Sequence, residues 1–146
     1  MDNFILKLRE ETGAGVMDCK RALDDAKGDY EKAKQIIFER GVIKAEKKSE
    51  RKTGSGVLET YVHSGRIGVI LELRCETDFV AKTDVFKELA HDLAMHIASM
   101  NPENVDQLIN QPFVKDESKT IKDLITQTIA KTGENVKIER FCRYEL

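Results

Sequence analysis

The first third of the chain carries apolar residues at helical spacing, interrupted by glycine. This pattern predicts three short helices, over residues 3–12, 16–27 and 29–41. Gly13, Gly28 and Gly41 stand just past the three apolar repeats, where glycine commonly ends a helix. Asp29 is a good N-cap residue and should begin the third helix. So small a bundle buries few large side chains, which suits a recognition module better than an enzyme.

A two-residue alternation of apolar and polar positions follows, which is typical of strands. Residues 57–63 and 66–75 predict two strands joined by a hairpin turn at Ser64-Gly65. The second strand places five side chains on one face: Ile67, Val69, Leu71, Leu73 and Cys75. A helix that starts near Thr83 should cover this face, because it carries a broad apolar stripe. The stripe consists of Val85, Phe86, Leu89, Ala90, Leu93, Ala94 and Ile97.

The last part of the chain predicts one more helix, over residues 118–131, and a strand over residues 135–144. Four residues of that strand share one parity: Val136, Ile138, Cys142 and Tyr144. Phe141 falls on the opposite face, so either a β-bulge interrupts the strand or a second surface is buried. The pattern as a whole predicts an α+β fold, in which an N-terminal three-helix module precedes a small antiparallel three-stranded sheet covered by helices.

Glycine and charge divide the predicted fold into a three-helix domain at 1–43, a basic flexible linker at 44–56 and an α+β core domain at 57–146. The linker reads KAEKKSERKTGSG and ends in glycine and serine. It is either a solvated spacer, which could continue the third helix, or a basic patch for RNA. No aromatic residue interleaves with the basic ones, so the nucleic-acid signal is weak.

A three-stranded sheet covered on one face leaves the other face to be explained. That second face is either solvated or buried in a homodimer through the core domain, with apolar residues such as Ile70 and Phe141 between the subunits. Cys142 could cross-link such a dimer under oxidation, and the alternative for it is a free buried thiol.

Composition and charge narrow the classes of function. The 146 residues are 34% charged with a formal net charge of -2, so no strong field draws nucleic acid to the chain. The apolar runs are too short to span a bilayer, and the N-terminus lacks the form of a signal peptide. Three widely spaced cysteines make no disulfide framework and fit a reducing compartment. We expect a cytoplasmic protein with neither a membrane nor a direct nucleic-acid partner.

The residue types needed for catalysis or metal binding do not come together in the sequence. Gly13-Ala14-Gly15 is no phosphate loop, because no Gly-Lys-Ser/Thr follows it. His91 and His96 are five residues apart, so they point in different directions from a helix. A thiol nucleophile at Cys75 is conceivable, but its inward position favours an inert core residue. We therefore expect no catalytic residue, metal or cofactor.

The point where the second strand turns into helix, Thr77-Asp78-Phe79-Val80, is a candidate binding site, called the corner below. Thr77 and Asp78 are good N-cap types, and a corner held by rigid elements can project its side chains outward. Phe79 is either a core aromatic, which the pattern alone favours, or an exposed wedge that enters a partner.

The turn before the second helix is a second candidate. Gly13 and Gly15 bring the backbone near a surface, and Val16 and Met17 follow with little polar cover. Met17 is either a core residue at the start of the helix, which the pattern alone favours, or an adaptable contact at an interface.

Two longer motifs resemble those of a known family. Residues 8–10 (LRE), 12–20 (TGAGVMDCK) and 22–23 (AL) resemble the N-terminal signature of bacterial translation elongation factor Ts. Residues 75–81 (CETDFVA) resemble its second signature, and 41–45 (GVIKA) and 133–135 (GEN) agree as well. The resemblance spans essentially the whole chain. Long family members carry two copies of the core and an inserted helical hairpin, whereas this chain resembles a compact form with one core.

The resemblance implies a function that pattern alone does not give. The family promotes guanine-nucleotide exchange on the GTPase elongation factor Tu, and its three-helix module resembles a ubiquitin-associated fold. Asp78 and Phe79 would then intrude near the Mg²⁺ and phosphate site of the GTPase. The other contact residues implied are Thr77, Val80, Val16, Met17, Gly13 and Gly15. The alternative is a ubiquitin-like or RNA-binding adaptor without exchange activity.

Overall fold

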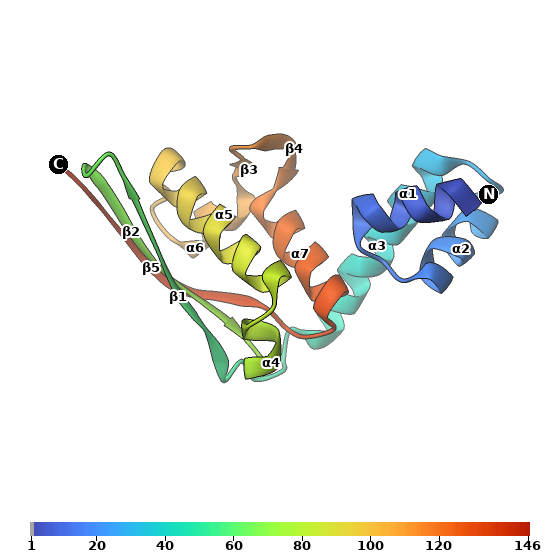
Figure 1. The fold of residues 1–146 in the computed structure, drawn as a ribbon, viewed down its shortest axis with the longest axis horizontal. Helices are drawn as coiled ribbons and strands as arrows, with labels where there is room; N and C mark the ends of the chain where they lie inside the picture. The colour runs from blue at the N-terminus through green and yellow to red at the C-terminus, as the bar shows by residue number, and fades with distance from the viewer. Residues whose placement is uncertain (1) are drawn as a thin grey trace.

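The N-terminal module consists of three helices packed around a small core of their own. The computed structural model describes residues 2–146 (Figure 1). The helices are α1 (Asp2–Thr12), α2 (Val16–Asp25) and α3 (Tyr30–Lys48). Their buried core is Leu8, Cys19, Ala22, Leu23, Ala26 and Ala33. The predicted cap is confirmed, because the Asp29 side chain accepts a 3.2 Å hydrogen bond from the N–H of Lys32.

The third helix does not end at Gly41, as the glycine pattern predicted, but continues to Lys48. Gly41 lies where α3 packs against α7 (Ile121–Thr132). A Cβ at this position would stand 3.8 Å from the Cβ of Ala130, which is an ordinary contact distance, so Gly41 is an interior residue of α3 rather than a helix end. As a result the segment between α3 and the first strand shrinks to residues 49–54. The division into domains stays a prediction.

The sheet contains β1 (Ser55–His63), β2 (Ile67–Cys75) and β5 (Lys137–Glu145) in the order β1-β2-β5, with both pairs antiparallel. The hairpin turn forms at Ser64-Gly65, where both residues have positive φ and the N–H of Arg66 bonds the carbonyl of His63. One sheet face is buried under α5 (Asp84–Met100), as the alternation predicted. Val85 is the exception in the predicted stripe, because its side chain is 37% exposed.

A β-bulge in β5 explains the break in its apolar pattern. Glu72 pairs with Arg140 while Leu73 pairs with Ile138, so Glu139 is an extra residue. Beyond the bulge the parity reverses. Phe141 therefore packs against the main core, which corrects its expected place on the second face. Cys142 is exposed on the open face rather than buried.

The polar segment after α5 holds more structure than the sequence predicted. It forms α6 (Val105–Asn110), β3 (Pro112–Phe113) and β4 (Asp116–Thr120), and α7 begins at Ile121 instead of Ser118. Thr120 and Asp123 form a capping box at this start. His96 of α5 fixes the segment from inside. Its Nδ1 accepts the N–H of Val114 at 3.2 Å, and its Nε2 donates to Gln111 at 2.9 Å.

The observed architecture confirms the predicted α+β class. Figure 1 shows the sheet at one end, the helices α5 and α7 in the middle, and the N-terminal module at the other end. The last helix of the module, α3, packs against α7 and so connects the two ends. Among residues 2–146, no helix combines the length and the apolarity that a membrane span requires.

Candidate protein-binding site

The corner forms a single helical turn, α4 (Asp78–Ala81), directly after β2. Thr77 caps this turn, because its Oγ1 accepts the N–H of Val80 at 3.3 Å. The thiol of Cys75 donates to the carbonyl of Thr77 at 3.2 Å. Two residues after α4 ends, Thr83 is the N-cap of α5, and its side chain accepts the N–H of Phe86. The corner is therefore fixed to a strand on one side and to a long helix on the other.

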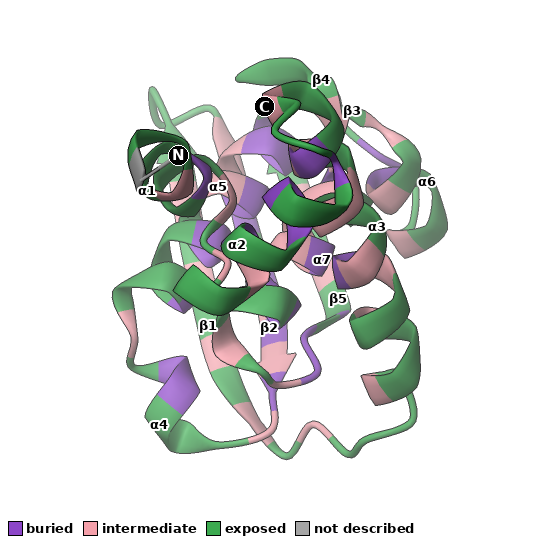
Figure 2. Ribbon diagram, turned by 90° about the vertical axis from the view of Figure 1, so that its right-hand side faces the viewer, coloured by how far each residue is buried: buried purple, intermediate pink, exposed green. Residues whose placement is uncertain are grey.

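The two faces of α4 differ sharply in exposure. Val80 and Ala81 are each only 5% exposed and belong to the main core, whereas Phe79 is 82% exposed and Asp78 is also exposed. Figure 2 shows this buried stretch of α4 beside exposed neighbours at the lower edge of the molecule. Val80 therefore anchors the corner, and its side chain is not at the surface for a partner. The Phe79 ring is outside its own fold, which removes the core interpretation.

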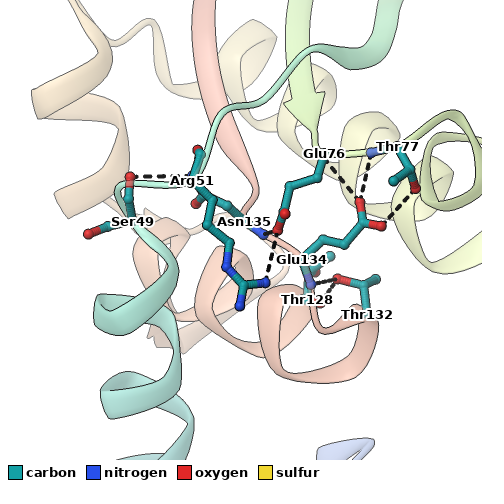
Figure 3. Close-up of polar contacts among 8 residues, drawn as sticks. All are labelled: Ser49, Arg51, Glu76, Thr77, Thr128, Thr132, Glu134 and Asn135. Carbon is teal, nitrogen blue, oxygen red and sulfur yellow. Dashed lines mark hydrogen bonds and ion pairs between the residues drawn. The ribbon is translucent and has the colours of Figure 1, made fainter.

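A carboxylate from another part of the chain holds the start of the corner. Glu134 follows Gly133, the left-handed C-cap of α7. Its Oε1 accepts the N–H groups of Glu76 and Thr77 at 3.1 and 3.0 Å, and its Oε2 accepts the Thr77 hydroxyl at 2.7 Å (Figure 3). Three donors thus converge on one side chain.

The next residue, Asn135, ties the same place to the end of α3. Its N–H bonds the Glu76 carboxylate at 2.6 Å, and its side-chain amide donates to the carbonyls of Arg51 and Ser49 at 2.9 and 3.4 Å (Figure 3). Arg51 also forms an ion pair of 3.6 Å with Glu76. The sequence did not reveal these contacts, because a lone acidic residue after a glycine cap has no distinctive spacing.

The second predicted group lies in the N-terminal module. Gly15 is the N-cap of α2, and Val16 and Met17 at its start are 46% and 56% exposed. Gly13 has a φ of +73°, and a Cβ there would overlap the Lys131 side chain of α7. The turn therefore lies beside the Lys131 side chain of α7, and the two apolar side chains are exposed to solvent. It belongs to a different part of the fold from the corner (Figure 1).

Cys75 lies beside the corner, and its surroundings decide whether its thiol is reactive. Burial raises the pKa of the Cys75 thiol, and the negative charge of Glu134 acts in the same direction. A thiol held protonated is a poor nucleophile, which speaks against the thiol-enzyme hypothesis. Within residues 2–146, no three His, Cys, Asp or Glu side chains gather as metal ligands would.

Comparison with known proteins identifies the family. The family model described as Elongation factor TS matches residues 20–106 and 76–146. The chain is 43% identical to elongation factor Ts of Thermotoga neapolitana over 188 aligned positions, which cover 99% of this chain and 95% of the relative. It is also 43% identical to that of Carboxydothermus hydrogenoformans, over 98% of this chain and 87% of the relative.

The aligned span of 188 positions exceeds the 146 residues of this chain, so the Thermotoga relative contains inserted residues that this chain lacks. The alignment nevertheless covers nearly all of both proteins, and the family model reaches both the module and the sheet. The chain belongs to the elongation factor Ts family, and it is a translation elongation factor rather than an enzyme.

Proposed function

We propose that the protein binds elongation factor Tu in the cytoplasm and promotes release of its GDP, with Asp78 and Phe79 entering near the Mg²⁺ and phosphate site. The observation that carries the proposal is the Phe79 ring, which is 82% exposed on a turn whose other apolar side chains are buried. A large aromatic residue on a rigid support is the kind of side chain that dominates protein interfaces.

The wedge would act on the groups that hold the nucleotide. GDP is bound through a phosphate loop and Mg²⁺. A ring pushed between neighbouring elements shifts the residues that position this metal, and the Asp78 carboxylate brings negative charge toward phosphates of the same sign. A thousandfold loss of GDP affinity requires about 4 kcal/mol of interface energy. Because the coupling is reciprocal, bound GDP weakens the exchange factor by the same factor.

The N-terminal module supplies a second contact in this proposal. Val16 and Met17 offer exposed apolar surface at the start of α2, and Gly13 and Gly15 let the backbone turn closely there. Methionine adapts its shape to a partner surface. This contact increases the affinity for the GTPase, whereas the corner distorts its nucleotide site.

The test is stopped-flow release of a fluorescent GDP analogue from elongation factor Tu, with and without this protein. We expect the release rate to rise with protein concentration and to reach a plateau. A release rate that stays at the intrinsic value at all concentrations would refute exchange activity. A steep salt-dependent affinity for RNA in a parallel titration would favour the adaptor alternative.

We further propose a homodimer through the open face of the sheet. This face exposes the large apolar side chains of Leu58, Val62, Ile70 and Tyr144, an unusual set for a surface that only meets water. Cys142 lies on it opposite Ile70. Light scattering at micromolar concentration should give twice the 16.6 kDa mass of the chain, and a monomer mass would remove the proposal.

A further inference from the structure

The corner depends on contacts from outside its own segment. A single helical turn is unstable by itself, because forming the first turn costs more than its few hydrogen bonds return. The buried side chains of Val80 and Ala81 hold α4 from beneath. The residues that lead into α4 are held from the side by Glu134, through the N–H groups of Glu76 and Thr77 and the Thr77 hydroxyl.

We propose that Glu134 is a positioning residue that holds the corner in one orientation, so that Phe79 is already in place before the partner arrives. The inference deepens the exchange function proposed above and rests on it. Thr77 is the shared point, since its hydroxyl donates to Glu134 and accepts the N–H of Val80. A side chain held in its bound orientation loses less conformational entropy on binding.

The neighbouring Asn135 extends this role to the module. It joins the Glu76 side chain to the backbone carbonyls of Ser49 and Arg51, just past the end of α3. Glu134 therefore holds the residues that lead into the corner, and Asn135 holds the backbone just past α3, the longest helix of the module. The short junction between α7 and β5 thus contacts both the residues that lead into α4 and the residues just past α3 (Figure 3).

The first experiment measures the order of the corner without any partner. The chain contains no tryptophan, so Phe79→Trp places a single reporter at the wedge. Time-resolved fluorescence anisotropy of this variant should show a restrained ring. Adding Glu134→Ala should introduce a large, fast depolarising component, whereas Glu134→Gln should change the decay little, because its amide oxygen still accepts both N–H groups.

Glu117→Ala is the matched control, because Glu117 is an exposed carboxylate of β4 in a different part of the fold. It should leave the anisotropy decay unchanged. An equally restrained ring with and without the Glu134 side chain would overturn the positioning role. This result does not depend on the GTPase, so it decides the inference even if the exchange function fails.

The second experiment measures GDP release with chains that keep Phe79, and it distinguishes a loss of positioning from a loss of folded protein. Partial unfolding lowers the active concentration, so it raises the concentration for half-maximal GDP release and leaves the plateau rate unchanged. Loss of positioning lowers the plateau. We expect Glu134→Ala to reduce the plateau rate about tenfold, which corresponds to about 1.4 kcal/mol, and Glu134→Gln to reduce it less than threefold. A wild-type plateau for Glu134→Ala would contradict the inference.

Discussion

Phe79 and Met17 differ from ordinary exposed apolar residues in how they are supported. Single apolar side chains are common on protein surfaces and need no explanation. Phe79, however, sits on a turn anchored by Val80 from below and by Glu134 from the side. Met17 follows a left-handed glycine turn that lies against α7. Neither side chain fills a core, so each can be truncated without opening a cavity.

Truncating Met17 should weaken binding while leaving the fold intact. Met17→Ala removes exposed surface from a proposed contact, and we expect the Kd for elongation factor Tu to rise about five- to tenfold, or roughly 1 kcal/mol. Isothermal titration calorimetry measures this change. Met100→Ala is the control, because Met100 is similarly exposed at the far end of α5. Equal affinities for the two variants would remove Met17 from the interface.

His96 should make the stability of the protein depend on pH between about pH 7 and about pH 5. Burial lowers the pKa of this imidazole from its ordinary value of 6.5, partly offset by the hydrogen bond to Gln111. Below about pH 6.5 the imidazole of His96 binds a proton in the unfolded chain but stays neutral in the folded chain. The free energy of unfolding should therefore fall as the pH drops, by at most about 1.4 kcal/mol per pH unit.

Urea unfolding at a series of pH values from about 7 to about 5 measures this slope. His96→Asn removes the titrating group and should flatten it in this range. The pKa of Glu72 is lowered by hydrogen bonds from Arg140 and Arg74, so its contribution is lost only at more acidic pH. An unchanged slope in the variant would show that another group is responsible.

At the scale of elements, the sequence predicted best where one face is continuously buried. The alternation in β2 and the stripe of α5 identified the main core, apart from Val85. The parity break at Phe141 left a bulge and a second buried surface as alternatives, and the structure shows the bulge. Gly41 misled, because a glycine in the interior of a helix looks the same in sequence as one that ends a helix. The elements α6, β3 and β4 escaped because runs of six, two and five residues are too short to establish a periodic pattern.

Replacing Gly41 should stabilise the protein. Alanine is favoured over glycine in a helix interior by about 1 kcal/mol. The added Cβ would lie 3.8 Å from Ala130 and 3.9 Å from Thr126, which are ordinary contact distances. We therefore expect Gly41→Ala to raise the free energy of unfolding by about 0.5–1 kcal/mol in a chemical denaturation experiment.

Gly13→Ala should have the opposite effect on the free energy of unfolding, so it serves as the comparison for Gly41→Ala. Its φ is positive and its Cβ would overlap Lys131, so it should destabilise the protein. A loss of stability in Gly41→Ala would mean that α3 and α7 approach more closely than the structure shows.

The candidate site was only partly predictable from the sequence, because a single helical turn and contacts between distant residues leave no periodic pattern. The corner itself is visible in sequence as a strand end followed by cap residues. Whether Phe79 points in or out depends on which side of one helical turn faces the core, and the pattern alone favoured the wrong side. Glu134 and Asn135 are distant in sequence from residues 76 and 77, so only the folded chain shows that they meet.

At the scale of the whole molecule, the fold places two proposed contact regions on separately packed parts. The module and the sheet each have a core of their own, and α3 against α7 joins them. The turn at Met17 belongs to the first part and the corner to the second (Figure 1). A partner that touches both is held by one and distorted by the other, which is how an exchange factor without chemistry of its own can act.

The most direct measurement is the plateau rate of GDP release from elongation factor Tu at saturating Phe79→Ala. Because the ring is 82% exposed, this variant should fold with wild-type stability in a thermal melt. We expect its plateau rate to be roughly thirtyfold below that of the wild type, as for the loss of about 2 kcal/mol at an interface hot spot. A correctly folded variant that releases GDP at the wild-type rate would contradict the wedge mechanism.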